Sequence, residues 1–213
     1  MKVAVSILSA DFANAWEELK VIDNDVDYYH MDVMDGAFVP NISFGAHVIK
    51  CFRAKTTKRF DTHLMIKHPK KYIKDFVNAG SDMISFHLEC DDDALSVIEE
   101  IHSYGKLAGI AIKPNTKVEE LIPYLKKVDY FLVMSVEPGF GGQKFMDSSL
   151  EKIEKLAKWR SSEKLNYLIS VDGGINDETA KLVVDKGIDF AVVGSYLLDK
   201  KDSHKKMKIL KNI

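Results

Sequence analysis

The chain has 213 residues, the length of one larger-than-average domain, and its 46% apolar and 29% charged residues exclude a disordered or collagen-like protein. Its 30 lysines and arginines oppose 32 aspartates and glutamates, for a formal net charge of -2. Without a basic excess we expect neither nucleic acid nor a membrane as a partner, so a bound phosphate group must be held locally.

Eight short runs rich in β-branched and aromatic residues recur along the chain, and stretches with helical spacing lie between them. Strands are predicted at residues 3–8, 27–33, 59–65, 82–88, 107–112, 129–136, 167–171 and 190–193. Helices are predicted at residues 13–22, 69–79, 92–104, 118–125, 149–159 and 177–186. Gly80, Gly105 and Gly187 each follow a helical stretch and indicate where it ends.

This alternation predicts parallel strands joined by crossover helices, and eight such units predict an α/β fold, a single-domain (β/α)8 TIM barrel over residues 1–213. The rival is an open doubly wound sheet, but no GxGxxG or Walker-type loop follows the first strand. The lysine-rich tail 199–213 is expected to form the last barrel helix, packed through Met207, Ile209 and Leu210.

Polar residues gather at the carboxyl ends of the predicted strands, where parallel barrels place their functional groups. In chain order they are Ser6, His30, Asp32, His63, His87, Glu89, Lys113, Ser135, Asp172, Gly194 and Ser195. Because residues i and i+2 of a strand share a face, His30 and Asp32 both point into the barrel.

A metal site follows from four of these groups. One inward histidine is commonly a hydrogen-bonded core residue, but His30, Asp32, His63 and Asp172 come from three strands and all are ligand types. Imidazole and carboxylate together suit one divalent transition metal, and burying these groups without a cation would carry a large desolvation cost.

Six of the 12 glycines follow the last three predicted strands, and Phe140 lies among them. They are Gly139, Gly141, Gly142, Gly173, Gly174 and Gly194. Turn geometry alone explains any one cluster, whereas together they favour a phosphate site, which barrels often build from the loops after strands seven and eight.

A phosphate beside a metal and two carboxylates indicates a phosphorylated sugar with a polarised carbonyl. Carboxylates on opposite faces can remove a proton and return it on the other side, through an enediolate that a Lewis-acid metal stabilises. The carbon would be inverted, so the residues predict an epimerase.

At these residues the sequence closely resembles the ribulose-phosphate 3-epimerase family, over nearly the whole chain. The matching segments are residues 6–12, 30–41, 62–65, 134–143, 171–175 and 194–195, with His87, Pro114 and Thr116. The HxDxMDGxFVPN and PGFGGQ blocks are highly specific, while VDGG alone would be weak.

The resemblance implies a TIM barrel of the ribulose-phosphate-binding type that interconverts D-ribulose 5-phosphate and D-xylulose 5-phosphate at C3. Asp32 and Asp172 would be its acid/base residues, and these two with His30 and His63 its metal ligands. The substrate would contact Ser6, His63, Gly139, Phe140, Gly141, Gly142, Gly173, Gly174, Gly194 and Ser195. The family's site is also lined by methionines that match Met34, Met65 and Met134, which the pattern alone indicates as core residues.

Other polar residues receive lesser roles. Asp35 is out of phase with Asp32 and is predicted to be structural, and His87 is predicted to support a ligand rather than bind metal. Lys113 lies at the edge of the site without assigned chemistry. Two departures from the family stand out: Val5 replaces a proline, and residues 196–198 read Tyr-Leu-Leu, which would alter the pocket wall near the phosphate.

Three alternatives stay open at the level of sequence: a 3-epimerase of a ketohexose phosphate such as D-allulose 6-phosphate, a non-catalytic phosphosugar-binding barrel, and a phosphosugar aldolase. The intact Gly-Phe-Gly-Gly and Asp-Gly-Gly-Ile segments favour the pentose epimerase. The paired carboxylates argue against a binding protein, and no machinery for carbon–carbon cleavage is evident.

The cofactor is predicted to be one divalent metal ion, zinc first, with iron, manganese and cobalt as alternatives. A homo-oligomer is expected by family analogy. Two distant cysteines, Cys51 and Cys90, and the absence of a signal peptide or a long apolar run indicate a cytoplasmic protein. The longest intervals between strand ends contain residues 38–41 and 139–145, so we expect access to the site to be controlled there.

Overall fold

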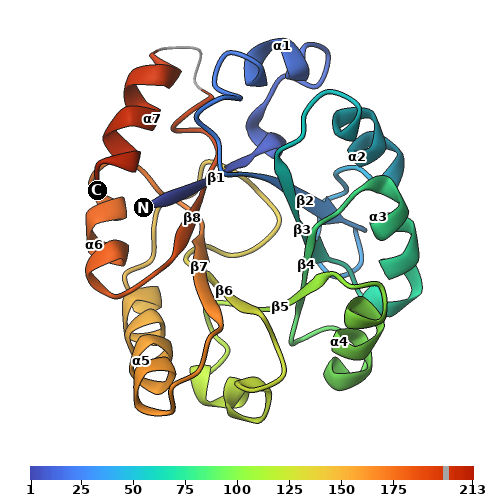
Figure 1. Cartoon of the computed structure of the whole chain (residues 1–213), viewed down its shortest axis with the longest axis vertical. Coiled ribbons are helices and arrows are strands. Elements are labelled where there is room, and N and C mark those ends of the chain that lie inside the picture. The colour runs from blue at the N-terminus through green and yellow to red at the C-terminus, as the bar shows by residue number, and fades with distance from the viewer. Residues whose placement is uncertain (199–201) are drawn as a thin grey trace.

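The eight predicted strands close into a barrel in which each strand pairs in parallel with the next and the eighth pairs with the first. The structure is a computed structural model that describes residues 1–198 and 202–213. It confirms the predicted (β/α)8 barrel and excludes the open sheet. Figure 1 shows the helices surrounding the strands, with both chain ends on the same side of the view.

The strands and helices alternate along the chain. The strands are β1 (Lys2–Ser6), β2 (Tyr28–Met34), β3 (Arg59–Met65), β4 (Met83–His87), β5 (Leu107–Ile112), β6 (Tyr130–Met134), β7 (Leu168–Asp172) and β8 (Phe190–Val193). The α-helices are α1 (Ala15–Leu19), α2 (Ala46–Arg53), α3 (Ile73–Ala79), α4 (Ala94–Ser103), α5 (Ser148–Ser162), α6 (Thr179–Asp185) and α7 (Ser203–Lys211). Three 3-10 helices complete the set: η1 (Ile7–Ser9), η2 (Pro69–Tyr72) and η3 (Val118–Tyr124).

Two apolar layers hold the barrel. The outward strand residues pack under the helices, where Ile84, Phe86 and Ile110 are fully buried. The inward residues form a separate plug of Ala4, Tyr28, Met83, Ala111, Tyr130, Leu132, Met134, Val136, Phe190 and Val192. Burial of each large apolar side chain in these layers stabilises the fold by about 1.5–3 kcal/mol. The plug closes the barrel interior, so polar groups on the inner face collect above it, toward the carboxyl ends of the strands.

The strand predictions hold to within two residues at either end. The prediction was wrong in ending the first strand at residue 8: the hydroxyl of Ser6 accepts a hydrogen bond from the Leu8 amide and begins η1. Helix α2 was not predicted, since Gly45 precedes it without a side-chain cap. Residues 118–124 form a 3-10 helix that contains Pro123, a residue without a backbone donor.

The last helix covers the barrel beside β1 (Figure 1). Met207 and Leu210 are fully buried, as predicted, whereas Ile209 is 37% exposed. Positions 207 and 210 lie one helical turn apart on one face, and 209 points away from it. Residues 199–201 of the predicted tail lie outside the described residues. Within the described ranges, no helix combines the length and the apolar character that crossing a membrane requires.

Candidate active site

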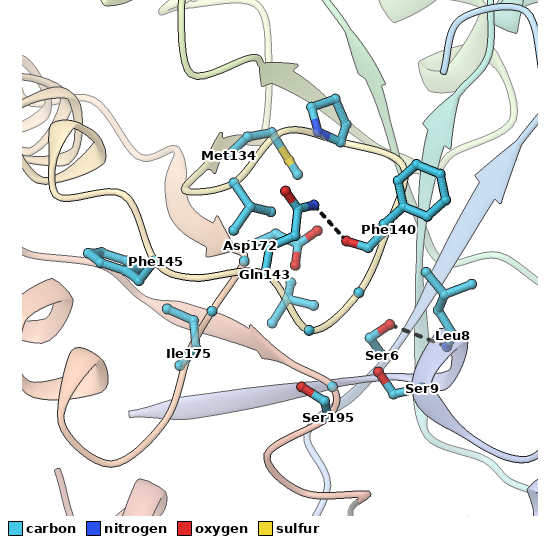
Figure 2. A pocket seen from close by; sticks show the side chains of 18 of the residues that line it. Ser6, Leu8, Ser9, Met134, Phe140, Gln143, Phe145, Asp172, Ile175 and Ser195 are labelled. Atoms are coloured by element: carbon cyan, nitrogen blue, oxygen red, sulfur yellow. Dashed lines mark hydrogen bonds between the residues drawn. The ribbon is translucent and has the colours of Figure 1, made fainter. Parts of the chain in front are cut away.

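A cavity of about 520 Å³ opens at the carboxyl ends of the strands. Asp32, Asp172 and all three predicted methionines line it, as do Ser6, Ser195 and the glycines of the β6, β7 and β8 loops. Figure 2 shows Asp172 and Met134 in this pocket, with Ser6, Ser9 and Ser195 gathered on one side of it. Phe145 and Ile175 lie on another side.

The four predicted ligand residues converge beneath the cavity. One ligand atom from each of His30, Asp32, His63 and Asp172 lies within 4.8 Å of the other three. Nε2 of His30 is 3.2 Å from Oδ1 of Asp32, and Nδ1 of His63 is 3.3 Å from the same oxygen. Both ring nitrogens lie 3.8 Å from Oδ2 of Asp172. This group can hold a metal ion.

His30 fits a metal ligand because one ring nitrogen is occupied and the other is orphaned. Its Nδ1 contacts Oδ2 of buried Asp61 at 2.8 Å, and the hydroxyl of Tyr130 donates to Oδ1 of Asp61 at 2.6 Å. Its Nε2 is buried and has no hydrogen-bond partner among the described residues. A buried polar atom without a partner is costly, and a carboxylate on the far nitrogen is the usual support of a metal-bound histidine.

His63 presents the opposite nitrogen to the centre. Its Nε2 lies 2.9 Å from Nε2 of His87, so Nδ1 faces Asp32 and Asp172. Nδ1 of His87 lies 3.1 Å from Oε2 of Glu89. The structure therefore places His87 behind a predicted ligand rather than among the ligands. Both histidines are fully buried.

The two carboxylates are in different electrostatic environments. Burial raises the pKa of Asp172 to about 6, and the negative charge of Asp32 adds to the rise. Burial also opposes ionisation of Asp32, but His30 and His63 outweigh it and hold the pKa of Asp32 well below its ordinary value. Burial lowers the pKa of His30, yet Asp32 and Asp61 raise it well above its ordinary value overall. Such a separation suits one carboxylate to be a base and the other an acid.

Ser6 supports Asp32 directly. Its hydroxyl donates to Oδ2 of Asp32 at 2.6 Å, and its backbone is paired with that of His30. This contact holds the Asp32 carboxylate between Ser6 on β1 and the two histidines. Ser6 also lines the cavity. It is thus in a position to meet a substrate, and its hydroxyl supports Asp32.

The glycine loops form the opposite wall of the cavity through close backbone approach. Gly174 has φ +64°, and a Cβ on it would lie 2.5 Å from the Phe145 amide nitrogen in the β6 loop. A Cβ on Gly194 would lie 2.6 Å from Oγ of Ser9. The loops after β6 and β7 therefore pack at a distance that only glycine permits, whereas Gly194 approaches the Ser9 side chain after β1.

The remaining predicted residues are distributed around this framework. Met34, Met65 and Met134 are nearly fully buried and also form part of the cavity wall. Phe140 is 55% exposed at the rim. His63 lies under the cavity rather than in its wall, and its predicted substrate contact stays a prediction.

Asp35 is structural, as its phase predicted. Oδ1 accepts hydrogen bonds from the amides of Ala37 and Phe38, and Oδ2 accepts one from Lys67. Burial tends to raise the pKa of Asp35, but these amide donors lower it overall. The same loop reaches the β6 loop, because the Asn41 amide donates to the Gly139 carbonyl at 2.7 Å. The two loops expected to control access are thus connected.

Sequence reasoning missed part of the wall and the supporting residues. Ser9, Gln143, Phe145 and Ile175 line the cavity without having been assigned to it. Gln143 donates to the carbonyls of Glu137 and Phe140 and so holds the β6 loop (Figure 2). Asp61 could have been found, because it lies two residues before His63 and shares its inward face.

Comparisons with known proteins find relatives that match most of this chain. A model of the "Ribulose-phosphate 3 epimerase family" matches residues 2–198. The ribulose-phosphate 3-epimerase of Treponema pallidum (strain Nichols) is 43% identical over 91% of this chain and 89% of its own length. That of Bacillus subtilis (strain 168) is 42% identical over 96% of this chain and 95% of its own.

Solved structures with low identity share the fold. A crystal structure of KGPDC from Streptococcus mutans has a TM-score of 0.77 and 13% identity, and the alignment covers 99% of this chain and 95% of that one. A structure of 3-hexulose-6-phosphate synthase has a TM-score of 0.72 and 18% identity, covering 100% of this chain and 99% of that one. At these identities the likeness concerns the fold alone.

Proposed function

This chain belongs to the ribulose-phosphate 3-epimerase family, and from that membership we propose how its residues invert C3 of a ketopentose phosphate. The chain is a carbohydrate epimerase, an isomerase whose substrate is a small phosphosugar. Its reaction is the interconversion of D-ribulose 5-phosphate and D-xylulose 5-phosphate.

Asp32 and Asp172 are the acid/base pair of this proposal. They stand on β2 and β7, with β8 and β1 between them in the closed barrel, so they approach a substrate from different sides. In one direction the ionised Asp32 removes the proton from C3, leaving a planar enediolate, and a protonated Asp172 gives its own proton to the opposite face and is left ionised. In the reverse direction the roles exchange. Return on the opposite face inverts the carbon.

The convergence of four ligand atoms within 4.8 Å, both carboxylates among them, is the observation that carries the proposal. His30, Asp32, His63 and Asp172 would hold one divalent cation through two imidazole nitrogens and two carboxylate groups. Bound there, the cation would supply Lewis acidity toward the carbonyl oxygen next to C3. Zinc is the first candidate, with iron, manganese and cobalt as alternatives, because mixed imidazole and carboxylate sites accept several ions.

The phosphate end of the substrate is proposed to lie against the glycine loops. The same cavity connects the two aspartates with Gly139–Gly142, Gly173, Gly174, Gly194 and Ser195. Backbone amides in such loops are the usual phosphate donors of barrels. Ser6 and His63 are proposed to contact the sugar near its reacting end, and the three methionines to exclude water around it.

A metal-replacement assay tests the proposal. The full chain is depleted with a chelator, re-supplied with one cation at a time, and assayed both for epimerisation and for exchange of the C3 hydrogen with solvent deuterium. We expect both activities to disappear and to return with Zn²⁺ or a related ion. Full activity without metal would remove the cation from the mechanism, and phosphosugar binding without C3 exchange would mean a binding protein.

The choice of substrate has its own measurement. We expect kcat/KM for D-ribulose 5-phosphate to exceed that for D-allulose 6-phosphate, and the reverse order would assign the ketohexose phosphate. A homo-oligomer, a cytoplasmic location and one functional domain over residues 1–213 stay predictions.

A further inference from the structure

Behind His63 lies a line of hydrogen bonds that the proposed function does not use. Nε2 of His63 is 2.9 Å from Nε2 of His87, and Nδ1 of His87 is 3.1 Å from Oε2 of Glu89. The line begins in the fully buried interior and ends at Glu89, whose side chain is 23% exposed. It joins the proposed metal centre to the edge of the barrel mouth.

At the outer end of the line, it is fixed which group donates each hydrogen bond and which accepts it. Oε1 of Glu89 accepts from the backbone N–H of Lys113 at 2.8 Å and from the hydroxyl of Thr116. A backbone N–H can only donate, so the atom facing it must be an acceptor. The ammonium of Lys152 holds this loop by donating to the carbonyls of Lys113, Pro114 and Thr116, at 3.0, 2.6 and 2.7 Å.

From this end the protons can be placed one by one. Burial tends to raise the pKa of Glu89, but its hydrogen bonds with His87, Thr116 and Lys113 lower it to about 2 overall. The ionised Oε2 therefore accepts as well, so Nδ1 of His87 carries the proton between them. Nε2 of neutral His87 is then an acceptor, which requires the proton on Nε2 of His63 and leaves the lone pair of Nδ1 facing Asp32 and Asp172. A neutral His63 protonated on Nδ1 instead, toward Asp32 at 3.3 Å, would set the His87 lone pair against the Glu89 carboxylate.

Water is kept away from the middle of this line. The ring of Phe38 packs on His87 with centroids 4.8 Å apart, and Nζ of Lys113 lies 3.9 Å from the centroid of the Phe38 ring. His87 is therefore fully buried beneath the β2 loop, away from solvent.

We propose that Glu89 is a positioning residue that fixes, through His87, the tautomer and ring orientation of His63, so that Nδ1 of His63 offers its lone pair to the centre. The inference rests on the proposed function only in taking that centre as a cation site. The physical basis is general: when one ring nitrogen of a histidine binds a metal, a hydrogen bond to the other nitrogen fixes the tautomer and the orientation of the ring.

Glu89→Gln reverses the polarity of the line without changing its shape. The amide oxygen must face the Lys113 N–H, so the NH2 group faces His87 and drives the His63 proton from Nε2 to Nδ1. We expect affinity for Co²⁺ alone, measured by chelator competition, to fall about 10–100-fold. Nitrogen-15 NMR of the metal-free protein should show the Nε2 proton of His63 in wild type and its loss in E89Q.

Two further variants separate positioning from general structure. Glu89→Ala leaves room for a water that can accept from His87, so its loss of affinity should be smaller than that of E89Q. His87→Phe breaks the line, so adding E89Q to it should cause no further loss. Glu119→Gln, at an exposed glutamate paired with Lys155, should bind Co²⁺ as wild type does.

The proposal is overturned if E89Q keeps the wild-type affinity and tautomer, if E89A is the more damaging variant, or if E89Q acts equally in the H87F background. These readouts do not depend on turnover. A tautomer shift in a protein without epimerase activity would contradict the proposed function and support the positioning role, whereas full activity with unchanged tautomers would do the reverse.

Discussion

The two sides of the barrel mouth serve the site by different means. On the β2–β4 side, His30, Asp32 and His63 contribute side chains that are almost completely buried and held by further buried side chains. On the β6–β8 side, the wall is largely backbone brought close by glycines, as at Gly173 and Gly174. One side depends on which atoms are present, and the other on the absence of a Cβ.

The difference predicts different sensitivities. A change of one atom within a buried hydrogen-bonded side chain alters charge or proton position on the β2–β4 side and leaves its shape intact. A single added methyl group on the β6–β8 side alters shape and leaves charge intact. Asp172 is the exception. It stands on β7, on the glycine side, but its Oδ2 faces His30 and His63 from the β2–β4 side.

The largest expected effect is on catalysis by the paired carboxylates. Asp32→Asn and Asp172→Asn each remove a group that takes or returns the C3 proton, and acid/base catalysis by one residue contributes about 10²–10⁴-fold. We expect kcat to fall at least that far in either variant while the circular dichroism spectrum is unchanged. Turnover and C3 deuterium exchange are the measurements.

Asp75→Asn on exposed α3 is the matched control and should leave turnover unchanged. If Asp172→Asn kept wild-type turnover, Asp172 would belong only to the wall of the pocket, and the division between the two sides would be complete. The acid/base mechanism proposed for the pair would then be wrong.

Substitutions of the residues that support His30 should have the next largest effect, on metal affinity and stability. Asp61→Asn keeps the shape of the side chain and removes its charge behind His30, so affinity for Co²⁺ should fall about 10–100-fold. Tyr130→Phe removes one donor to a buried carboxylate and should lower the free energy of unfolding by about 1–3 kcal/mol. Chelator competition and denaturant unfolding measure the two. Equal Co²⁺ affinity in D61N and wild type would separate Asp61 from the centre.

The same division explains how much the sequence could predict. The barrel follows from eight strand–turn–helix units, and the metal group follows from period-2 alternation, which places His30 and Asp32 on one face. Local patterns of this kind are fully present in the sequence. Glycines after the last three strands also indicated the rim, since glycine is used where backbones approach closely.

Pairings between residues far apart in the sequence could not be found in this way, even though strand phase shows that Asp61 points inward. Asp61 and Tyr130 are separated by 69 positions, and Glu89 and Thr116 by 27, so their pairing depends on the register of the strands. Ser9 and Phe145 carry no chemical signal of their own. Helix α2 was missed for a local reason, the lack of a capping side chain at Gly45.

The glycine side should show a smaller but more shape-dependent effect. Gly174→Ala introduces a methyl group 2.5 Å from the Phe145 amide nitrogen, so the β6 and β7 loops must separate. We expect KM for the phosphosugar to rise about tenfold, which corresponds to about 1.4 kcal/mol, with a smaller change in kcat. Steady-state kinetics and thermal unfolding check this.

Gly105→Ala is the matched control for backbone strain. Gly105 has φ +66°, close to the +64° of Gly174, but nothing lies within 4 Å of a Cβ built there. It should lose stability from the positive φ and keep the wild-type KM. A rise in KM in both variants would assign the effect to lost stability rather than to the approach of the two loops.

The smallest predicted effect concerns the contact between the two sides. Asn41 in the β2 loop donates to the Gly139 carbonyl in the β6 loop, so Asn41→Ala removes one hydrogen bond, worth about 1 kcal/mol. Because that energy favours the observed arrangement of the β6 loop at the cavity wall, KM should rise about fivefold while Co²⁺ affinity is unchanged. Asn115→Ala, at an exposed asparagine in the β5 loop, should change neither. A loss of Co²⁺ affinity in N41A would mean that the glycine loops and the buried histidines act as one unit, because a change made at the rim would then have reached the metal centre.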